Sequence, residues 1–238
     1  MLFKQSTLDE ILTSEKEMIE SGFDRYNDYY QNASDVIEVF RNGMIQSICP
    51  SCSIFCRFFS QVDKHLVLAL FSTLRLHSAQ CTMNLRHVLE AGTWAAYALA
   101  HKNLGDFINS DIDSDIDFQR LGNERYKWLE SNFSDDVKNI KVLKELLNKF
   151  FTHSNILSAN QTCRNNTKAE AFETQFFDYE NEKTVKCELV LIAKSAISIM
   201  GLLYKVNQKY EGFKIQDEWE TKYCDLDSKI EISRDHVT

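Results

Sequence analysis

The chain has 238 residues and a formal net charge of −8, with only 7 glycines and 1 proline. So few helix-breaking residues favour long helices joined by short connections. The negative charge argues against broad binding of DNA or of anionic membranes, although a local basic groove would still allow RNA to bind. A chain of this length can bury roughly 70% of its unfolded surface, which is enough to form a core without further support.

The cell compartment is predicted from the N-terminus, the apolar runs and the cysteines. The first ten residues, MLFKQSTLDE, contain no apolar signal core. No uncharged apolar run reaches the ~18 residues of a membrane span, because Arg75 interrupts one candidate and Lys194 the other. The 7 cysteines are an odd number without a secretory signal, so we expect free thiols. These features predict a cytoplasmic protein that does not insert into membranes.

Two helices are predicted before residue 50. A capping box formed by Thr7 and Glu10 begins the first, in which apolar residues recur at helical intervals to about residue 31. The second begins near residue 35 and continues until Pro50 ends or bends it. We expect these N-terminal helices, within residues 1–62, to pack on a core formed by the rest of the chain.

The stretch from Asp63 to Asn103 organises the predicted fold. It contains no proline and a single glycine, and it is too apolar to lie on a surface. We predict one long buried helix here, or two helices joined near Ser78, with the other helices packed around it.

Charged side chains would line up along this stretch if it were one continuous helix. Arg75 and Arg86 are eleven residues apart, an interval that returns a side chain to nearly the same face. Glu90 lies four residues after Arg86, within reach of an ion pair. Because an unpaired buried charge is costly, this polar stripe either meets polar groups of neighbouring helices or lines a functional cleft.

The C-terminal half is predicted to be helical with one irregular segment. Helices are expected at about residues 118–133, 134–153 and 182–210, with a short hairpin as an option near residues 170–180. Residues 213–238 are mostly polar. They are predicted to form a loose tail, with Trp219 and Tyr223 docked on the rest of the protein.

No internal repeat or low-complexity linker divides the chain. The fold prediction is therefore a single all-α domain, a bundle of about six helices, with residues 63–212 as its core.

Four residues have side chains that could bind zinc. Cys49 and Cys52 have the spacing of a zinc knuckle, and His77 and Cys81 lie one turn apart if residues 77–81 are helical. Cysteine is also among the residues most often buried, so ordinary core thiols explain the same pattern. A redox dithiol at Cys49 and Cys52 would need a strand followed by a helix, which the sequence does not predict.

Two segments resemble a known family. Residues 85–99, LRHVLEAGTWAAYAL, resemble the R-x-x-x-E helix of bacterial proteins in the broad HEPN-like helical-bundle group. Residues 146–159, LLNKFFTHSNILSA, resemble their second motif, a histidine near the start of a loop that precedes a last long helix. The resemblance extends over roughly residues 64–210 and depends on Arg86, Glu90, Tyr97 and His153.

The resemblance implies a helical bundle, often dimeric. Many HEPN domains act as metal-independent ribonucleases or belong to toxin–antitoxin and phage-defence systems. Their ribonuclease signature is an arginine followed four to six residues later by a histidine, and no pair with this spacing occurs here.

Three functional hypotheses follow. The first is a HEPN-like helical interaction protein of a bacterial defence or toxin–antitoxin type, which forms a homodimer or binds another protein and has no catalytic role. The second is a ribonuclease in which Arg86 binds phosphate, His153 transfers a proton near neutral pH and Glu90 orients one of them. The third is a helical protein stabilised by zinc bound to the cysteine and histidine set above.

Overall fold

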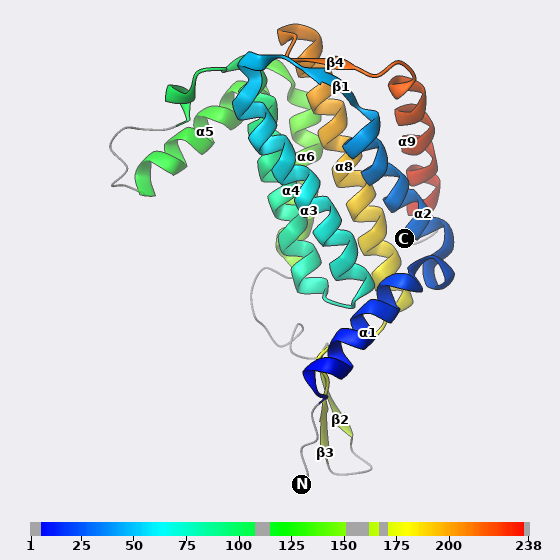
Figure 1. Ribbon diagram of the computed structural model, residues 1–238. Coiled ribbons are helices and arrows are strands. Elements are labelled where there is room, and N and C mark those ends of the chain that lie inside the picture. The colour runs from blue at the N-terminus through cyan, green and yellow to red at the C-terminus, as the bar shows by residue number, and fades with distance from the viewer. Residues whose placement is uncertain (1–5, 108–114, 151–161, 167–170, 236–238) are drawn as a thin grey trace.

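The computed structural model describes residues 6–107, 115–150, 162–166 and 171–235 (Figure 1). Within these ranges the chain is mostly helical, which confirms the predicted all-α bundle. The helices are α1 (Leu8–Glu20), α2 (Gly22–Glu38), α3 (Ser53–Leu74), α4 (Ser78–Ala100), α5 (Asp115–Asn132), α6 (Ser134–Phe150), α8 (Glu182–Tyr210) and α9 (Trp219–Asp235). The strands are β1 (Ile45–Ile48), β2 (Cys163–Asn166), β3 (Ala171–Thr174) and β4 (Phe213–Ile215).

The stretch predicted as one or two helices forms two, α3 and α4, which pack side by side (Figure 1). The turn between them contains Leu76, whose φ of 57° breaks the helical path. Helix α3 begins at Ser53, ten residues before the predicted start, and includes most of the aromatic segment that precedes residue 63. The continuous polar stripe was therefore a wrong prediction, because Arg75 ends α3 whereas Arg86 lies within α4.

Helix α8 lies in the interior, where it packs against α2, α3, α4, α6 and α9. It approaches α4 closely at Gly92, where an added Cβ would lie only 2.4 Å from Cδ1 of Ile199. Glycine therefore allows the two helix axes to come close together at this point.

Among the described helices, α8 alone is long and apolar enough to cross a membrane, but 72% of the relevant window is buried inside the protein. The core helix of a bundle has the same length and composition.

The predicted capping box at the first helix is confirmed. The backbone N–H of Thr7 donates to Oε2 of Glu10 at 2.7 Å, and the N–H of Glu10 donates to the Thr7 hydroxyl at 3.3 Å. The helix ends earlier than expected, at Glu20, and α2 begins at Gly22. Helix α1 has no buried residue and projects from the bundle (Figure 1).

A two-stranded pair joins distant parts of the chain. Strand β1 pairs with β4 in antiparallel register, with Ile48 opposite Phe213. Since β1 leads directly into Cys49 and then into α3, the sequence segment around Cys49 and Cys52 does have a strand followed by a helix. A second antiparallel pair, β2 with β3, is the predicted hairpin, although it lies at residues 163–174 and not 170–180.

The prediction of a loose C-terminal tail was wrong. Residues 219–235 form α9, which packs on α8 and α2. Its buried residues are Trp219, Leu226 and Ile230, exposed by 2%, 5% and 1%. The spacing of these three apolar residues is compatible with one helix face, but the polar residues between them obscured it in the sequence.

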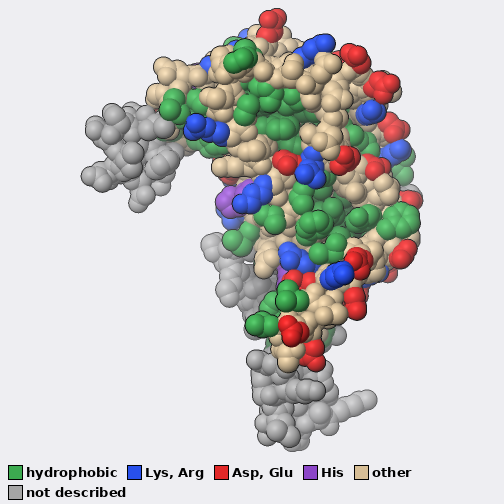
Figure 2. Space-filling view, in the orientation of Figure 1, with side chains coloured by type: hydrophobic (Ala, Val, Ile, Leu, Met, Phe, Trp, Pro, Cys, Tyr) green, Lys and Arg blue, Asp and Glu red, His purple; other side chains and the backbone are tan. Residues whose placement is uncertain are grey.

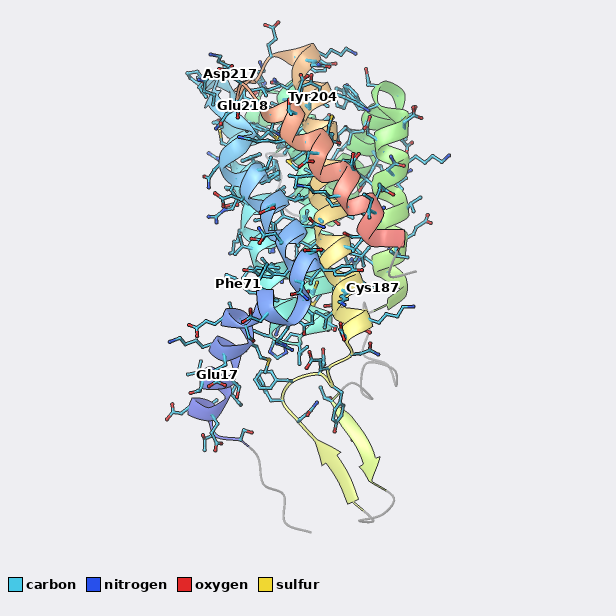
Figure 3. The ribbon with its side chains drawn as sticks, turned by 90° about the vertical axis from the view of Figure 1, so that its right-hand side faces the viewer. Glu17, Phe71, Cys187, Tyr204, Asp217 and Glu218 are labelled. Atoms are coloured by element: carbon cyan, nitrogen blue, oxygen red, sulfur yellow. The ribbon has the colours of Figure 1, made fainter. Side chains whose placement is uncertain are left out.

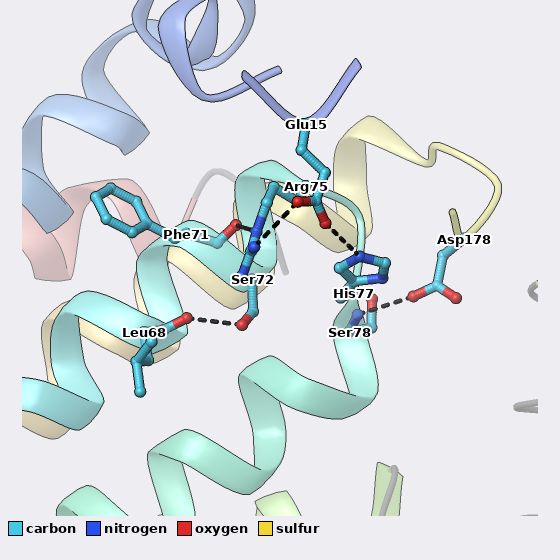
Figure 4. A network of polar contacts seen from close by, with 8 residues as sticks. All are labelled: Glu15, Leu68, Phe71, Ser72, Arg75, His77, Ser78 and Asp178. Carbon is cyan, nitrogen blue, oxygen red and sulfur yellow. Dashed lines mark hydrogen bonds and ion pairs between the residues drawn. The ribbon is translucent and has the colours of Figure 1, made fainter. Parts of the chain in front are cut away.

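The α3–α4 turn is a junction for three segments (Figure 4). From α1, Glu15 accepts a hydrogen bond from Nη1 of Arg75 at 3.4 Å and lies 3.3 Å from Nε2 of His77. From the segment after β3, Asp178 accepts from the backbone N–H of Ser78 at 2.8 Å. That carboxylate satisfies one of the free N–H groups at the start of α4.

We expect replacement of Glu15 by alanine to release α1 from the bundle. The helix has no fully buried residue and only the half-buried Met18 and Ile19 against the core, whereas Glu15 makes two polar contacts with the turn. Amide hydrogen exchange across residues 8–20 should become faster, while the free energy of global unfolding should change by only about 1 kcal/mol.

Glu17 provides the matched control, because it is exposed on the same helix (Figure 3). Glu17→Ala should leave the rate of amide hydrogen exchange across residues 8–20 the same as in the parent. Unchanged exchange in Glu15→Ala would mean that apolar contacts alone hold α1.

Candidate functional site

Glu90 is the centre of an ion-pair cluster that joins three helices. Its Oε2 accepts a hydrogen bond from Nη2 of Arg125 on α5 at 2.6 Å, and its Oε1 accepts from Nζ of Lys144 on α6. The expected partner of Glu90 was Arg86, one turn earlier on α4. Among the described residues no ion pair of Arg86 is found, so the predicted Arg86–Glu90 pair is replaced by pairs between helices.

Arg125 is enclosed by aromatic rings. Its side chain is 3% exposed, and its Cζ lies 4.2 Å from the ring centre of Trp94 and 4.5 Å from that of Tyr126. Both distances are in the range of cation–π attraction. Its Nε and Nη1 are buried without a hydrogen-bond partner. Glu90 therefore supplies the hydrogen-bonded negative charge that compensates this enclosed cation.

The electrostatic environment keeps Glu90 ionised. Burial raises its pKa, but the hydrogen bond from Lys144 and the charge of Arg125 outweigh burial, and the pKa is lowered overall. A carboxylate in this state is suited to holding cations in place and poorly suited to exchanging protons near neutral pH.

Only part of the predicted catalytic trio can be located. Arg86 and Glu90 lie on α4, whereas His153 lies outside the described residues. The approach of His153 to the other two stays a prediction. Another histidine is nearby: His87 is exposed and stacks on His65 with ring centres 4.6 Å apart. Partial desolvation and the charges of His65 and Arg86 lower its pKa.

The predicted zinc ligands do not come together. Cys49 and Cys52 precede α3, while His77 and Cys81 follow it. A helix of 22 residues is about 33 Å long at ~1.5 Å per residue. One ion cannot bind both pairs, so this four-ligand site was a wrong prediction. Across the described ranges, no group of three or more histidine, cysteine or acidic side chains has a metal-binding arrangement.

A buried carboxyl group lies beside the start of α4. Glu188 on α8 is 6% exposed, and its Oε1 has no hydrogen-bond partner. Burial raises its pKa to about 7, an effect that the hydroxyls of Ser78 and Thr73 oppose and the charge of Asp178 reinforces. A carboxyl group with a pKa raised in this way changes its protonation state near neutral pH.

A groove of about 430 Å³ separates α6 from α9, and α8 forms its floor. Its lining includes apolar and acidic side chains from all three helices, among them Val142, Leu143, Ile197, Tyr223 and Asp227. The groove is open to solvent, and it adjoins the outer surface of α6.

Sequence reasoning missed Arg125 and Lys144 as partners of Glu90. They lie 35 and 54 residues away along the chain, and no periodicity relates positions so far apart. No protein-family model, curated protein or solved structure matches the chain. Its function is therefore inferred from its geometry.

Proposed function

We propose that this chain is a helical interaction protein that binds a second copy of itself through the outer face of α6. The observation that carries the proposal is the pair Val142 and Leu146. These side chains are 57% and 36% exposed, and their separation of four residues places them one turn apart on the same helix face. An exposed apolar pair of this kind, on a helix face whose other exposed side chains are polar or charged, is a natural centre for a protein contact.

The charges that flank this pair are complementary under twofold symmetry. Lys138 and Glu145 are both exposed on the face that carries Val142. In an antiparallel pairing of two α6 helices centred near Val142, Lys138 of each chain lies opposite Glu145 of the other. A twofold contact of this kind forms both ion pairs at once.

The adjacent groove extends the proposed contact. Val142 and Leu143 are the apolar part of the α6 wall of the groove between α6 and α9, which also includes Asp136 and Asn139. A helix of the second chain placed against α6 covers this rim as well, in the manner of a helix bound in an apolar groove.

The resemblance to HEPN-like bundles agrees with this proposal, because many of them are dimers. Membership of a bacterial defence or toxin–antitoxin system, and a cytoplasmic location, belong to the same proposal. Binding is favoured over RNA cleavage for two reasons. The Glu90 carboxylate is engaged by two cations, and on the face in Figure 2 the described lysine and arginine side chains are scattered among acidic ones.

The test is the oligomeric state measured by sedimentation equilibrium. The parent should form a dimer. Val142→Glu should weaken the dimer at least tenfold, because seating a carboxylate in an apolar contact costs ~1.4 kcal/mol or more. Lys138→Glu should weaken it too, and adding Glu145→Lys to that variant should restore it.

Met83 on α4 is the matched control, since its exposure of 57% equals that of Val142. Met83→Glu should dimerise like the parent. A parent that remains monomeric at high concentration, or a dimer that Val142→Glu leaves intact, would overturn the proposal.

A further inference from the structure

Cys49 and Cys52 lie where a strand passes into a helix. Strand β1 ends at Ile48, residues Pro50–Cys52 form a 3₁₀ turn, and α3 begins at Ser53. The backbone N–H of Cys52 donates to the carbonyl of Cys49 at 2.9 Å. A turn closed in this way keeps its first and fourth Cα atoms within ~7 Å, and disulfides span Cα separations of ~4.4–6.8 Å. The two cysteines are therefore close enough to form a disulfide.

The two thiols differ in accessibility. Cys49 is exposed to solvent, whereas Cys52 is 1% exposed. The Cys49 sulfur lies 3.1 Å from the Ser51 hydroxyl. That hydroxyl, the Ser51 amide and the charge of Lys102 lower the pKa of Cys49, while burial raises that of Cys52. In thiol–disulfide exchange by two cysteines, the exposed thiol with the lowered pKa attacks the substrate first. The buried thiol then attacks the mixed disulfide.

The surroundings fix the geometry of this pair. The backbone N–H of Cys49 donates to the carbonyl of Gly212 at 2.9 Å. Gly212 in turn donates to the side chain of Asn207 at 2.8 Å. A Cβ added at Gly212 would lie 2.3 Å from Cδ2 of Leu99 and 3.3 Å from the Cys52 sulfur, so glycine leaves room for both side chains. The turn is thus attached to the end of α8 and does not move as a free loop.

We propose that Cys49 and Cys52 form a redox-active dithiol that reduces disulfide bonds in a substrate. The Cys49 thiolate attacks one sulfur of the substrate disulfide, whose S–S bond breaks and releases the first thiolate. The Cys52 thiol then loses its proton and attacks the Cys49 sulfur. The mixed disulfide breaks, the second substrate thiolate leaves, and a Cys49–Cys52 disulfide forms. Two electrons pass to the substrate, and the protons of the two cysteines end on the two product thiols.

This activity is independent of the proposed dimer, because the dithiol lies at β1 and α3 and not on α6. Cys56, one turn further along α3, is the nearest competing thiol in the sequence. It is half-buried, and a disulfide between it and Cys52 would join the turn to α3 without the closed turn that brings Cys49 and Cys52 together. Variants of Cys52 and Cys56 therefore separate the proposed pair from its neighbour.

The experiment exposes the reduced full-length chain to buffers of increasing oxidised-to-reduced glutathione ratio. Acid quenching, alkylation and peptide mass spectrometry then locate the bonds. The parent should acquire a Cys49–Cys52 disulfide, and Cys56→Ser should behave in the same way. Cys52→Ser should instead accumulate glutathione on Cys49, because the resolving thiol is missing.

Cys224 is the control for the claim that Cys49 is the first thiol to react. It is also exposed but has no cysteine three residues away. Cys49 should react with a limiting alkylating agent faster than Cys224. Absence of the Cys49–Cys52 disulfide in fully oxidised glutathione, or failure of Cys52→Ser to trap glutathione on Cys49, would overturn the proposal.

Discussion

Arg125→Ala should lower the free energy of unfolding by about 2–4 kcal/mol, less than the ~3–5 kcal/mol typical of a fully buried ion pair. The substitution removes a side chain enclosed between Trp94 and Tyr126 and takes one cation from Glu90. The cost is below that of a fully buried pair because Lys144 still holds the carboxylate, which is 35% exposed. Urea denaturation at neutral pH would measure the change.

Arg86→Ala is the matched control. Arg86 lies on α4 four residues before Glu90, and no ion pair with it is found within the described part of the chain. We expect the free energy of unfolding of this variant to lie within about 0.5 kcal/mol of the parent's, because Arg86 is only half-buried and its removal breaks no ion pair of the described residues. A double-mutant cycle between Arg125→Ala and Glu90→Ala should give a coupling energy of about 1–3 kcal/mol. A larger loss in Arg86→Ala than in Arg125→Ala would contradict the assignment of partners.

The second large effect is a pH dependence of the free energy of unfolding, caused by Glu188. Its pKa of about 7 in the folded protein exceeds the ordinary value of 4.5. Between these two values the folded state keeps a proton that the unfolded chain has lost. Stability should therefore fall as pH rises from about 4.5 to about 7 and level off above, with a total loss of roughly 3 kcal/mol at ~1.36 kcal/mol per pKa unit.

Glu188→Gln should remove this loss, because the amide stays neutral throughout. The variant should be more stable than the parent at pH 8 and nearly equal to it at pH 5, in unfolding curves recorded at both values. Glu182→Gln, on the same helix but 66% exposed, should not change the pH profile. Equal stability of Glu188→Gln and the parent at pH 8 would show that the carboxyl group is not destabilised by burial.

Local pattern was sufficient to predict most helices. The capping box at Thr7 and the apolar spacing of α6 and α8 depend on residues within a few turns of one another, so they can be recognised in a sequence. The break at Leu76 was harder to locate, because a residue with positive φ in an apolar run has no marker such as glycine. The start of α3 was missed because Pro50 and the cysteines read as a connection.

Long-range contacts could not be predicted. The pairing of Ile48 with Phe213 and of Arg125 with Glu90 depends on how helices pack, and many polar residues compete for each partner. The strand before the dithiol could not be predicted for the same reason. Strand β1 forms by pairing with β4, which lies far away in the sequence. The short segment before Cys49 carries too little information to predict a strand by itself.

The separation in sequence of the paired elements has a consequence for how the chain folds. Helices α3 and α4 are joined by three residues, so their contacts cost little loop entropy and can form early. The β1–β4 pair must wait until residues 45–48 meet residues 213–215, which follow about two thirds of the chain later. The hydrogen bond from Cys49 to Gly212 belongs to this late step. A nascent chain thus passes through a stage in which its helical hairpin is formed while the Cys52 thiol, which is buried in the folded protein, is still open to oxidants.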